Sequence, residues 1–510
     1  MTAHPTSLPN GHSSSSSHAH KPHAFSTRAI HVGSEPHRSS TGGVNPALDL
    51  STTFRQSSVG VHAGFEYARS GNPTRLAYER LLASLEGADE RLRERLEEEG
   101  VLKGLAEEGE GEGEYERWVK ENGPAALAFS SGSAATATVV QALVGNGGHI
   151  VSVGDVYGGS SRYFLKVAGP LQGAETTFVD LSYGDVEATA GVEAGESDDV
   201  RKEKEDGAIL DRLERAIRPE TKVIWIETPT NPMLNLVPIS LIARVASSHN
   251  IPLAVDNTFA SPYLQQPLSL GATVVLASST KYVSGHSDVV GGYVATATPS
   301  LLSKLRFLQN AHGAIPSPFD SYLLLRSLKT LPLRIRQHSL NALAVARFLN
   351  EVAAPAGLVR DVRYPGLNRG AGETSTQKRE RALAWAQLAP EAKRWAASLG
   401  YSQESDGGFP AGGMVSFHIA SAHAASQSET AAAERFLERL RVFTLAESLG
   451  GVESLAELPI KMTHGGVDPV HRASLGIDGE LVRLSVGVED VEDLLEDLRQ
   501  ALGAATAVGK

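Results

Sequence analysis

The stretch Ser278-Ser279-Thr280-Lys281-Tyr282-Val283-Ser284-Gly285-His286 follows an apolar run, residues 273–277, whose pattern predicts a buried strand. A lysine at the end of such a strand, preceded by two hydroxyl side chains, has the setting of a nucleophile beside a bound phosphate. Burial and neighbouring cations lower the pKa of a lysine until its neutral amine attacks a carbonyl. Ser278 and Thr280 could donate hydrogen bonds to phosphate oxygens. Taken alone, the pattern is more often a solvated lysine that follows a strand.

A second predicted strand, which ends in an acid, changes this interpretation. The apolar run that begins at Ile251 ends at Asp256. Functional groups gather at the carboxyl ends of parallel strands, so we expect Asp256 and Lys281 to face one crevice. Pyridoxal phosphate needs both groups, because a lysine binds its aldehyde and a carboxylate keeps its ring nitrogen protonated. The pair therefore predicts a pyridoxal-phosphate site, although an acid at a strand end by itself often only caps a helix.

The composition predicts a globular protein and excludes several classes of partner. The chain has 510 residues, enough for two or three domains, and 41% of them are hydrophobic. Its formal net charge of −12 argues against nucleic acid or an anionic membrane as the main partner. No apolar run is long enough for a transmembrane helix. The absence of cysteine excludes disulfides and thiolate metal sites. We expect no bound metal, and we predict a cytoplasmic location, which a chain without disulfides suits.

Composition divides the chain into four predicted parts. Residues 1–24 form a Ser/His-rich tail, which we expect to be disordered because it lacks the apolar core of a secretory signal. An extended arm (25–72) precedes a large cofactor-binding domain (73–332) and a smaller C-terminal domain (333–510). Three insertions are predicted, at residues 91–122, 183–207 and 368–410.

Apolar segments alternate with helical ones through the large domain. This alternation predicts an α/β fold whose mostly parallel central sheet is covered by helices. The expected strands are 125–129, 149–153, 222–226, 253–255, 273–277 and 292–295, and further strands are expected in the C-terminal domain near 413–419 and 481–486.

Two more strand ends carry residues that suit a phosphorylated, planar cofactor. Gly132 and Ser133 lie in a small-residue turn that opens a predicted helix, where backbone N–H groups bind anions. Tyr157 follows the next strand, and its ring could stack on a planar group or simply cover the core.

Charged residues far from these strands complete the candidate set. Tyr67 and Arg69 lie two residues apart in the arm, where they could bind phosphate, in their own subunit or in a neighbouring one. Arg483 alternates with apolar residues in a predicted C-terminal strand. An arginine there is usually solvated, but an amino-acid substrate needs such a group to bind its carboxylate in a bidentate manner.

These residues lie in motifs that resemble the Cys/Met metabolism family of pyridoxal-phosphate enzymes, which contains the cystathionine lyases and synthases. The resemblance runs from about Phe25 to Leu502 and rests on seven long motifs in order, namely 65–75, 155–164, 227–232, 254–262, 278–292, 445–455 and 483–495. It implies a fold-type I, transferase-like architecture with a smaller C-terminal domain and an N-terminal arm.

The resemblance also implies a role for each candidate residue. Lys281 would bind the cofactor's aldehyde, Asp256 its ring nitrogen, and Tyr157 the face of its ring. The phosphate would be held by Gly132, Ser133, Ser278 and Thr280, with Tyr67 and Arg69 supplied by the adjacent protomer. This makes at least a dimer necessary, and tetramers are usual in the family. The substrate would contact Arg483, Asn231, Ser454, Arg162, Glu453 and Glu66.

Within the family the chain looks nearest to the γ-lyases, because Glu453 and Glu66 resemble their acidic residues. This implies elimination from L-cystathionine, giving L-cysteine, 2-oxobutyrate and ammonia. Cystathionine γ-synthesis from O-acylhomoserine and cysteine uses the same residues and remains the first alternative, followed by O-acylhomoserine sulfhydrylation. A catalytically silent binding protein is the alternative from another class.

Overall fold

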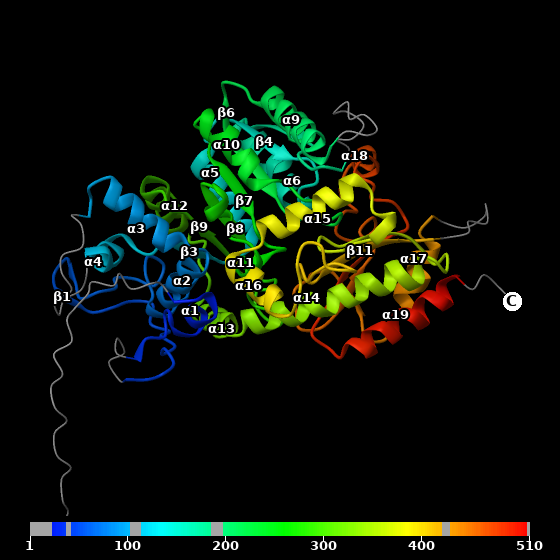
Figure 1. The fold of residues 1–510 in the computed structure, drawn as a ribbon. Coiled ribbons are helices and arrows are strands. Elements are labelled where there is room, and N and C mark those ends of the chain that lie inside the picture. The colour runs from blue at the N-terminus through cyan, green and yellow to red at the C-terminus, as the bar shows by residue number, and fades with distance from the viewer. Residues whose placement is uncertain (1–22, 37–41, 103–113, 185–196, 421–428, 507–510) are drawn as a thin grey trace, which may run out of the picture.

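The computed structural model describes residues 23–36, 42–102, 114–184, 197–420 and 429–506 (Figure 1). A seven-stranded sheet forms the centre of the large domain, in the order β3 (Ala126–Phe129), β9 (Gly292–Ala295), β8 (Val274–Ala277), β7 (Leu253–Asp256), β6 (Thr221–Glu227), β4 (His149–Val153) and β5 (Glu175–Val179). Strands β4 to β8 run parallel, and only β9 is antiparallel to its neighbours. The predicted mostly parallel sheet is therefore confirmed.

The sequence missed one strand of this sheet. Strand β5 lies at the edge and reads Glu-Thr-Thr-Phe-Val, and all of its residues are at least partly exposed. The other six strands are more apolar and largely buried, because helices cover the central part of the sheet. An edge strand with polar residues lacks this apolar signal.

Helices enclose the sheet and make the apolar core. Those of the large domain are α2 (Pro73–Leu85), α3 (Ala88–Glu98), α4 (Glu114–Asn122), α5 (Gly132–Leu143), α6 (Gly158–Tyr163), α7 (Gly169–Gln172), α9 (Asp198–Ala216), α10 (Ile239–Ser248), α11 (Ser261–Leu264), α12 (Pro299–His312) and α13 (Pro318–Leu328). Helix α5 packs on β8 and β9, and α2 packs on β3. Helix α2 begins where Asn72 accepts hydrogen bonds from the backbone N–H groups of Thr74 and Arg75, as an N-cap does.

The C-terminal domain has a second sheet of five strands, in the order β10 (Val359–Arg363), β11 (Met414–Ile419), β14 (Leu481–Ser485), β13 (Leu455–Glu457) and β12 (Thr444–Leu445). All pairs are antiparallel except β12 with β13. Helices α14 (Leu331–Phe348), α17 (Ala431–Arg439) and α19 (Val491–Thr506) pack together beside it, with their own apolar core. The predicted domain boundary at residues 332 and 333 falls in the first turn of α14 and remains a prediction.

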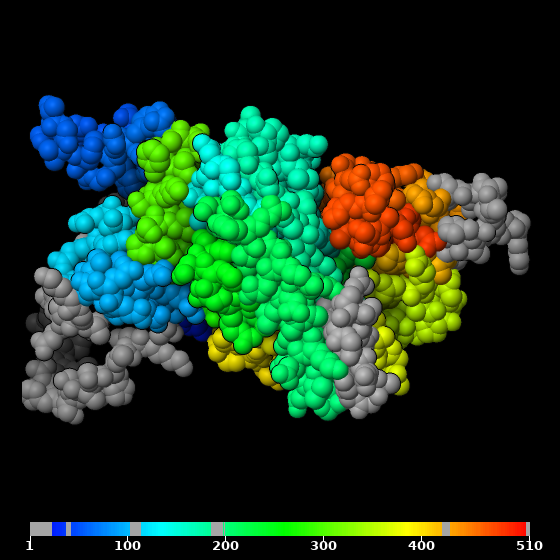
Figure 2. Space-filling model, turned by 90° about the horizontal axis from the view of Figure 1, so that it is seen from above, coloured from blue at the N-terminus to red at the C-terminus, as the bar shows by residue number. Residues whose placement is uncertain are grey.

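The two domains also meet away from α14. On the face shown in Figure 2, the orange-red segment that contains α18 (Pro469–Ser474) lies against the teal part of the large domain. The rings of His471 and Phe178 make this contact, with centroids 5.9 Å apart. The blue arm, with α1 (Phe25–His31), β1 (Gln56–Ser58) and β2 (Val61–His62), lies at the other end of the molecule, and both of its short strands are exposed.

The predicted insertions fall partly on well-packed helices, and their boundaries remain predictions. In the third, Trp385 on α15 (Ser375–Gln387) packs edge-on against Phe409, and Trp395 on α16 (Pro390–Ser398) packs against Tyr263. Most of the Ser/His tail, and parts of the first two insertions, lie outside the described residues. Within the described ranges, every helix is too short or too polar to cross a membrane.

Candidate active site

A cavity of about 250 Å³ opens where the parallel strands of the large domain end and the C-terminal domain meets them. Strands β3, β6, β7 and β8 lead into its lining from one side, and β14 contributes from the other. Nine of the predicted site residues line it: Gly132, Ser133, Tyr157, Asn231, Asp256, Ser278, Thr280, Lys281 and Arg483. The fold thus brings together side chains from both domains that lie far apart in the sequence.

Lys281 is held in a buried loop directly after β8. Its Nζ donates a hydrogen bond to Ser448 Oγ at 2.9 Å. Burial and the nearby charge of Arg483 lower the pKa of Lys281 to about 8, although Glu457 and Glu447 oppose the shift. Arg334 of α14 fixes the loop by donating to the carbonyl oxygens of Tyr282 and Val283. A lysine with this pKa is a far better nucleophile at neutral pH than a solvated one.

Asp256 ends β7 beside this lysine loop. Its Oδ1 accepts hydrogen bonds from Thr258, from the backbone N–H at 2.9 Å and from Oγ1 at 2.5 Å. Burial raises the pKa of Asp256, and both hydrogen bonds oppose that shift because they stabilise the ionised form. The carboxylate is therefore set to pair with a protonated ring nitrogen.

The start of α5 forms an anion-binding turn on the same cavity. Ser131 caps the helix by accepting from the backbone N–H of Ala134 at 3.0 Å. A Cβ at Gly132 would lie 2.9 Å from the Cβ of Ser278, so the turn needs glycine to approach the lysine loop this closely. Gly132 and Ser133, at the start of the helix, line the cavity together with Ser278 and Thr280, and backbone N–H groups at a helix N-terminus bind anions. This set of donors fits a phosphate.

Tyr157 precedes α6, and 43% of the residue is exposed. Its backbone N–H donates to Glu227 Oε2 at 2.9 Å. Burial raises the pKa of its phenol, against the opposing charge of Arg162. A Cβ at Gly159 would lie 2.3 Å from the Tyr157 ring, so this ring position requires glycine. The ring is thus available to stack on a planar group in the cavity.

Arg483 on β14 is the buried cation of the site, with 2% of its side chain exposed. Its Nη1 contacts Asn231 Oδ1 at 2.8 Å and Glu457 Oε1 at 2.9 Å, and its Nη2 donates to the carbonyl of Ser448 at 2.8 Å. Its Nε has no hydrogen-bond partner among the described residues. A buried donor without a partner is costly, so it marks a place for an anionic ligand atom.

Six other predicted residues do not line the cavity in the described chain. Ser454 is buried and donates to Glu489 Oε2 at 2.9 Å, while Glu453 accepts from Ser287. Glu66 and Arg162 are exposed. Tyr67 and Arg69 also lie outside, on the arm, where Arg69 donates to Asn310 Oδ1 at 3.2 Å.

The sequence interpretation missed several residues that line the cavity. Glu447 and Ser448 are two of them, although only Glu453 and Ser454 had been predicted from the same loop. Ser448 has a positive φ of 92°, which is unusual for serine and typical of strained functional loops. Glu227 also lines the cavity, and an acid at the end of a predicted strand, like Asp256, was the signal that could have found it.

The donors and acceptors of the cavity fit pyridoxal phosphate. A lysine, a strand-end carboxylate, an aromatic ring and an anion-binding turn are the groups that hold its aldehyde, ring nitrogen, ring face and phosphate. Arg483 Nε remains for the carboxylate of an amino acid.

Comparisons with known proteins give the same assignment. A family model described as Cys/Met metabolism PLP-dependent enzyme matches residues 26–93, 119–385 and 401–503. The cystathionine gamma-lyase of Sus scrofa is 42% identical over 482 residues, which cover 94% of each chain. The crystal structure of cystathionine gamma-lyase from yeast is 39% identical with a TM-score of 0.71, covering 96% of this chain and 100% of that one. The cystathionine gamma synthase of Xanthomonas oryzae pv. oryzae, in complex with cystathionine, is 33% identical with a TM-score of 0.70, covering 95% and 99%.

Proposed function

The chain belongs to the Cys/Met metabolism family of PLP-dependent enzymes, and from this premise we propose that it cleaves the γ carbon–sulfur bond of L-cystathionine. With the uptake of one water molecule, the products are L-cysteine, 2-oxobutyrate and ammonia. The two γ-lyases described above, from Sus scrofa and from yeast, support this choice of reaction.

One feature of the cavity carries the proposal: a lysine and an arginine that are both prepared for an amino acid. Arg483 offers its open Nε to the substrate's carboxylate and is kept in place by Asn231 and Glu457. Lys281 reaches the same cavity with a pKa of about 8. A carboxylate bound at Arg483 therefore orients the α-amino group and Cα of the substrate toward Lys281.

The two carboxyl-end residues of β7 and β8 supply the proton chemistry at Cα. When bound, pyridoxal phosphate would draw electrons from the substrate's Cα and so make its proton acidic. Lys281 removes this proton as a general base, and Asp256 holds the proton of the ring nitrogen. Ser448 Oγ, as the hydrogen-bond partner of Nζ, keeps the amine directed into the cavity.

The far end of the substrate requires different residues. Tyr157, which lines the cavity, is proposed to give a proton to the departing sulfur after the second proton has left Cβ. Glu447 lines the cavity and is assigned to the distal ammonium group of cystathionine, since a carboxylate attracts a cation far more strongly than a neutral thioether. Glu66 and Arg162 are proposed to extend this end, and Glu453, which Ser287 holds, to support the loop.

We also propose that the arm contributes residues to the active site of a second subunit. Tyr67 and Arg69 lie outside the cavity of their own chain, and the arm's two strands are exposed. We propose that both residues complete the phosphate site of a neighbouring protomer, within a dimer or a tetramer built from two such dimers. The cytoplasmic location remains a prediction.

Cystathionine γ-synthesis is the second candidate, favoured by the similarity to the Xanthomonas synthase. The two reactions are separated by offering the purified protein cystathionine alone, and then O-acylhomoserine with cysteine. We expect 2-oxobutyrate to form from cystathionine at least about tenfold faster than cystathionine forms from the other pair, a difference of about 1.4 kcal/mol in activation free energy. The reverse order would make the protein a synthase.

Lys281→Ala is the control for the site. Loss of the base should lower turnover by about a thousandfold or more and abolish the visible absorbance of cofactor bound through this lysine. Substitution of Arg326, an exposed arginine on α13, by alanine is the matched control and should leave both unchanged. Full activity in Lys281→Ala would end the proposal.

A further inference from the structure

A second carboxylate lies beside Asp256, and the mechanism above does not use it. Glu227 ends β6 and pairs with Asp256 in the parallel register of β6 and β7. Directly paired residues project from the same face of a sheet, and both side chains line the cavity. Two carboxylates at this spacing in a buried site do not both remain ionised without cost.

Hydrogen bonds distinguish the two acids. Asp256 Oδ1 accepts two hydrogen bonds from Thr258, which stabilise a negative charge. Glu227 Oε2 accepts the backbone N–H of Tyr157, while its Oε1 is buried with no partner among the described residues. An ionised oxygen in that position would lose its hydration without compensation, whereas a protonated one carries its own donor. The proton of the pair therefore belongs on Glu227.

We propose that Glu227 is a positioning residue for the cofactor ring, which stays protonated, anchors the backbone of Tyr157 and leaves Asp256 as the single negative charge beside the ring nitrogen. One acid thereby fixes both the group that stacks on the ring and the charge that faces its nitrogen. The inference rests on the cofactor site of the proposed function but not on which substrate that site takes.

The electrostatic surroundings of Glu227 favour the same assignment. Burial, the charge of Asp256 and the charge of Asp155 raise the pKa of Glu227 well above its usual range, and the hydrogen bond from the Tyr157 N–H and the nearby Ser160 hydroxyl oppose them. For Asp256, burial raises the pKa and the two hydrogen bonds of Thr258 lower it.

The first test is infrared spectroscopy of the holoenzyme at pH 8, comparing wild type with Glu227→Gln. The carbonyl stretch of a protonated carboxylic acid should be present in the wild type and missing from the variant. Glu86, Asp155 and the partly buried Glu380 contribute little at this pH, because their pKa values are raised only to about 7. If the band persists in Glu227→Gln, the proton lies elsewhere and the proposal fails.

The second test separates positioning from simple packing. Glutamine keeps an acceptor for the Tyr157 N–H without a charge, so Glu227→Gln should retain the visible circular dichroism of the bound cofactor within about twofold. Glu227→Ala leaves that N–H unpaired and should lose cofactor about tenfold faster on dilution, with a weaker dichroism. Glu380→Gln, at a partly buried acid on α15, is the matched control. Equal behaviour of the glutamine and alanine variants would overturn the proposal. Both readouts follow the cofactor directly, so they stand even if cystathionine is not the substrate.

Discussion

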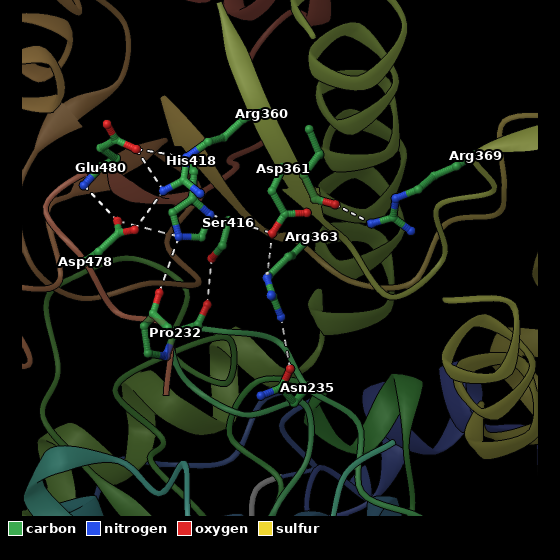
Figure 3. Close-up of polar contacts among 12 residues, drawn as sticks. Pro232, Asn235, Arg360, Asp361, Arg363, Arg369, Ser416, His418, Asp478 and Glu480 are labelled. Carbon is green, nitrogen blue, oxygen red and sulfur yellow. Dashed lines mark hydrogen bonds and ion pairs between the residues drawn. The ribbon is translucent and has the colours of Figure 1, made fainter. Parts of the chain in front are cut away.

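The five-stranded sheet carries two arginines on one face, Arg363 on the edge strand β10 and Arg483 on the central strand β14. Comparing their surroundings shows how a binding site differs from a structural contact. Arg363, Ser416, Arg483 and Glu457 lie in register across β10, β11, β14 and β13. Three of them hold the loop of residues 231–235 in the large domain. Arg483 contacts Asn231. Ser416 donates to the carbonyl of Pro232 at 2.6 Å, and Arg363 donates to Asn235 Oδ1 at 3.2 Å (Figure 3).

The two arginines differ in how exposed their side chains are and in whether Nε has a partner. The side chain of Arg363 is 34% exposed, and its Nε pairs with Asp361 at 3.0 Å within a group that includes His418, Arg360, Asp478 and Glu480 (Figure 3). The side chain of Arg483 is 2% exposed, the residue lines the cavity, and its buried Nε has no partner among the described residues. Residue type and the row across the sheet are the same, although Arg363 ends the edge strand β10 and Arg483 lies within the central strand β14. Burial and one open donor distinguish the two arginines. A buried donor without a partner lowers the stability of the fold, so its role is to bind a ligand.

The largest effect on activity is expected at the buried arginine, Arg483. Arg483→Ala should lower kcat/KM for cystathionine by about 100- to 1000-fold, because it removes the carboxylate's partner and leaves Glu457 buried without its cation. Arg483→Lys should recover only part of this loss, since lysine cannot bind a carboxylate with a planar fork. Steady-state kinetics measure kcat/KM for both variants. An unchanged kcat/KM in Arg483→Ala would remove the functional distinction between Arg483 and Arg363.

The next effect concerns the pH at which the protein without cofactor takes it up. Only the neutral amine of Lys281 attacks an aldehyde, so the rate of cofactor capture should rise with pH through a midpoint at about pH 8 and level off at higher pH. Arg483 is one cause of the lowered pKa, so Arg483→Ala should move this midpoint to higher pH. Stopped-flow absorbance at several pH values measures the midpoint. A shift to lower pH would show that the arginine does not act on the lysine.

A smaller effect is expected at Asp361. Burial raises the pKa of this carboxyl, but His418, whose Nδ1 lies 3.6 Å from Oδ2, and the charge of Arg363 outweigh it and hold the pKa well below its usual range. Its contribution to stability is therefore present above about pH 4, the unfolded value, and is lost as pH falls toward the folded value. Asp361→Asn should cost about 1 kcal/mol of unfolding free energy at pH 7, less at pH 3, by urea denaturation. Asp211→Asn, at an exposed site on α9, is the control, and a cost that grows at low pH would contradict the sign.

The smallest effect is expected at Arg360, whose side chain is 49% exposed although it pairs with Asp478 at 2.7 Å and Glu480 at 2.8 Å. Arg360→Ala should change the unfolding free energy by less than about 1 kcal/mol, and the difference should shrink in high salt. Its kcat/KM should equal that of the wild type. A loss comparable to that of Arg483→Ala would mean that the exposed group also supports the cavity.

The strands illustrate what could be predicted about the fold. Strands β4 and β9 have the residues that the sequence predicts, because buried central strands are almost continuously apolar. Strand β5 was missed because it is polar at its start and covered only in part. Strands β12 and β13, with two and three residues, are too short to produce a pattern.

The site shows a similar division. Lys281 and Asp256 were found because each lies at the end of an apolar run, and sheet topology then requires them to meet. Glu447 and Glu453 lie in one loop, and local sequence gives no reason to prefer the one that faces the cavity. Glu227 carries the same signal as Asp256, but its unpartnered oxygen is visible only in the folded chain.

The sequence by itself determined the reactive groups and the strands that carry them, because periodicity and strand-end position are local properties of the chain. The tertiary structure decided which charges are buried, which are satisfied and which are left open toward a ligand. Arg483 and Asn231 are 252 residues apart in sequence, and only packing of the two domains brings them to 2.8 Å. Desolvation and hydrogen-bond geometry arise from such contacts, so they set the chemistry of the site only once the chain has folded.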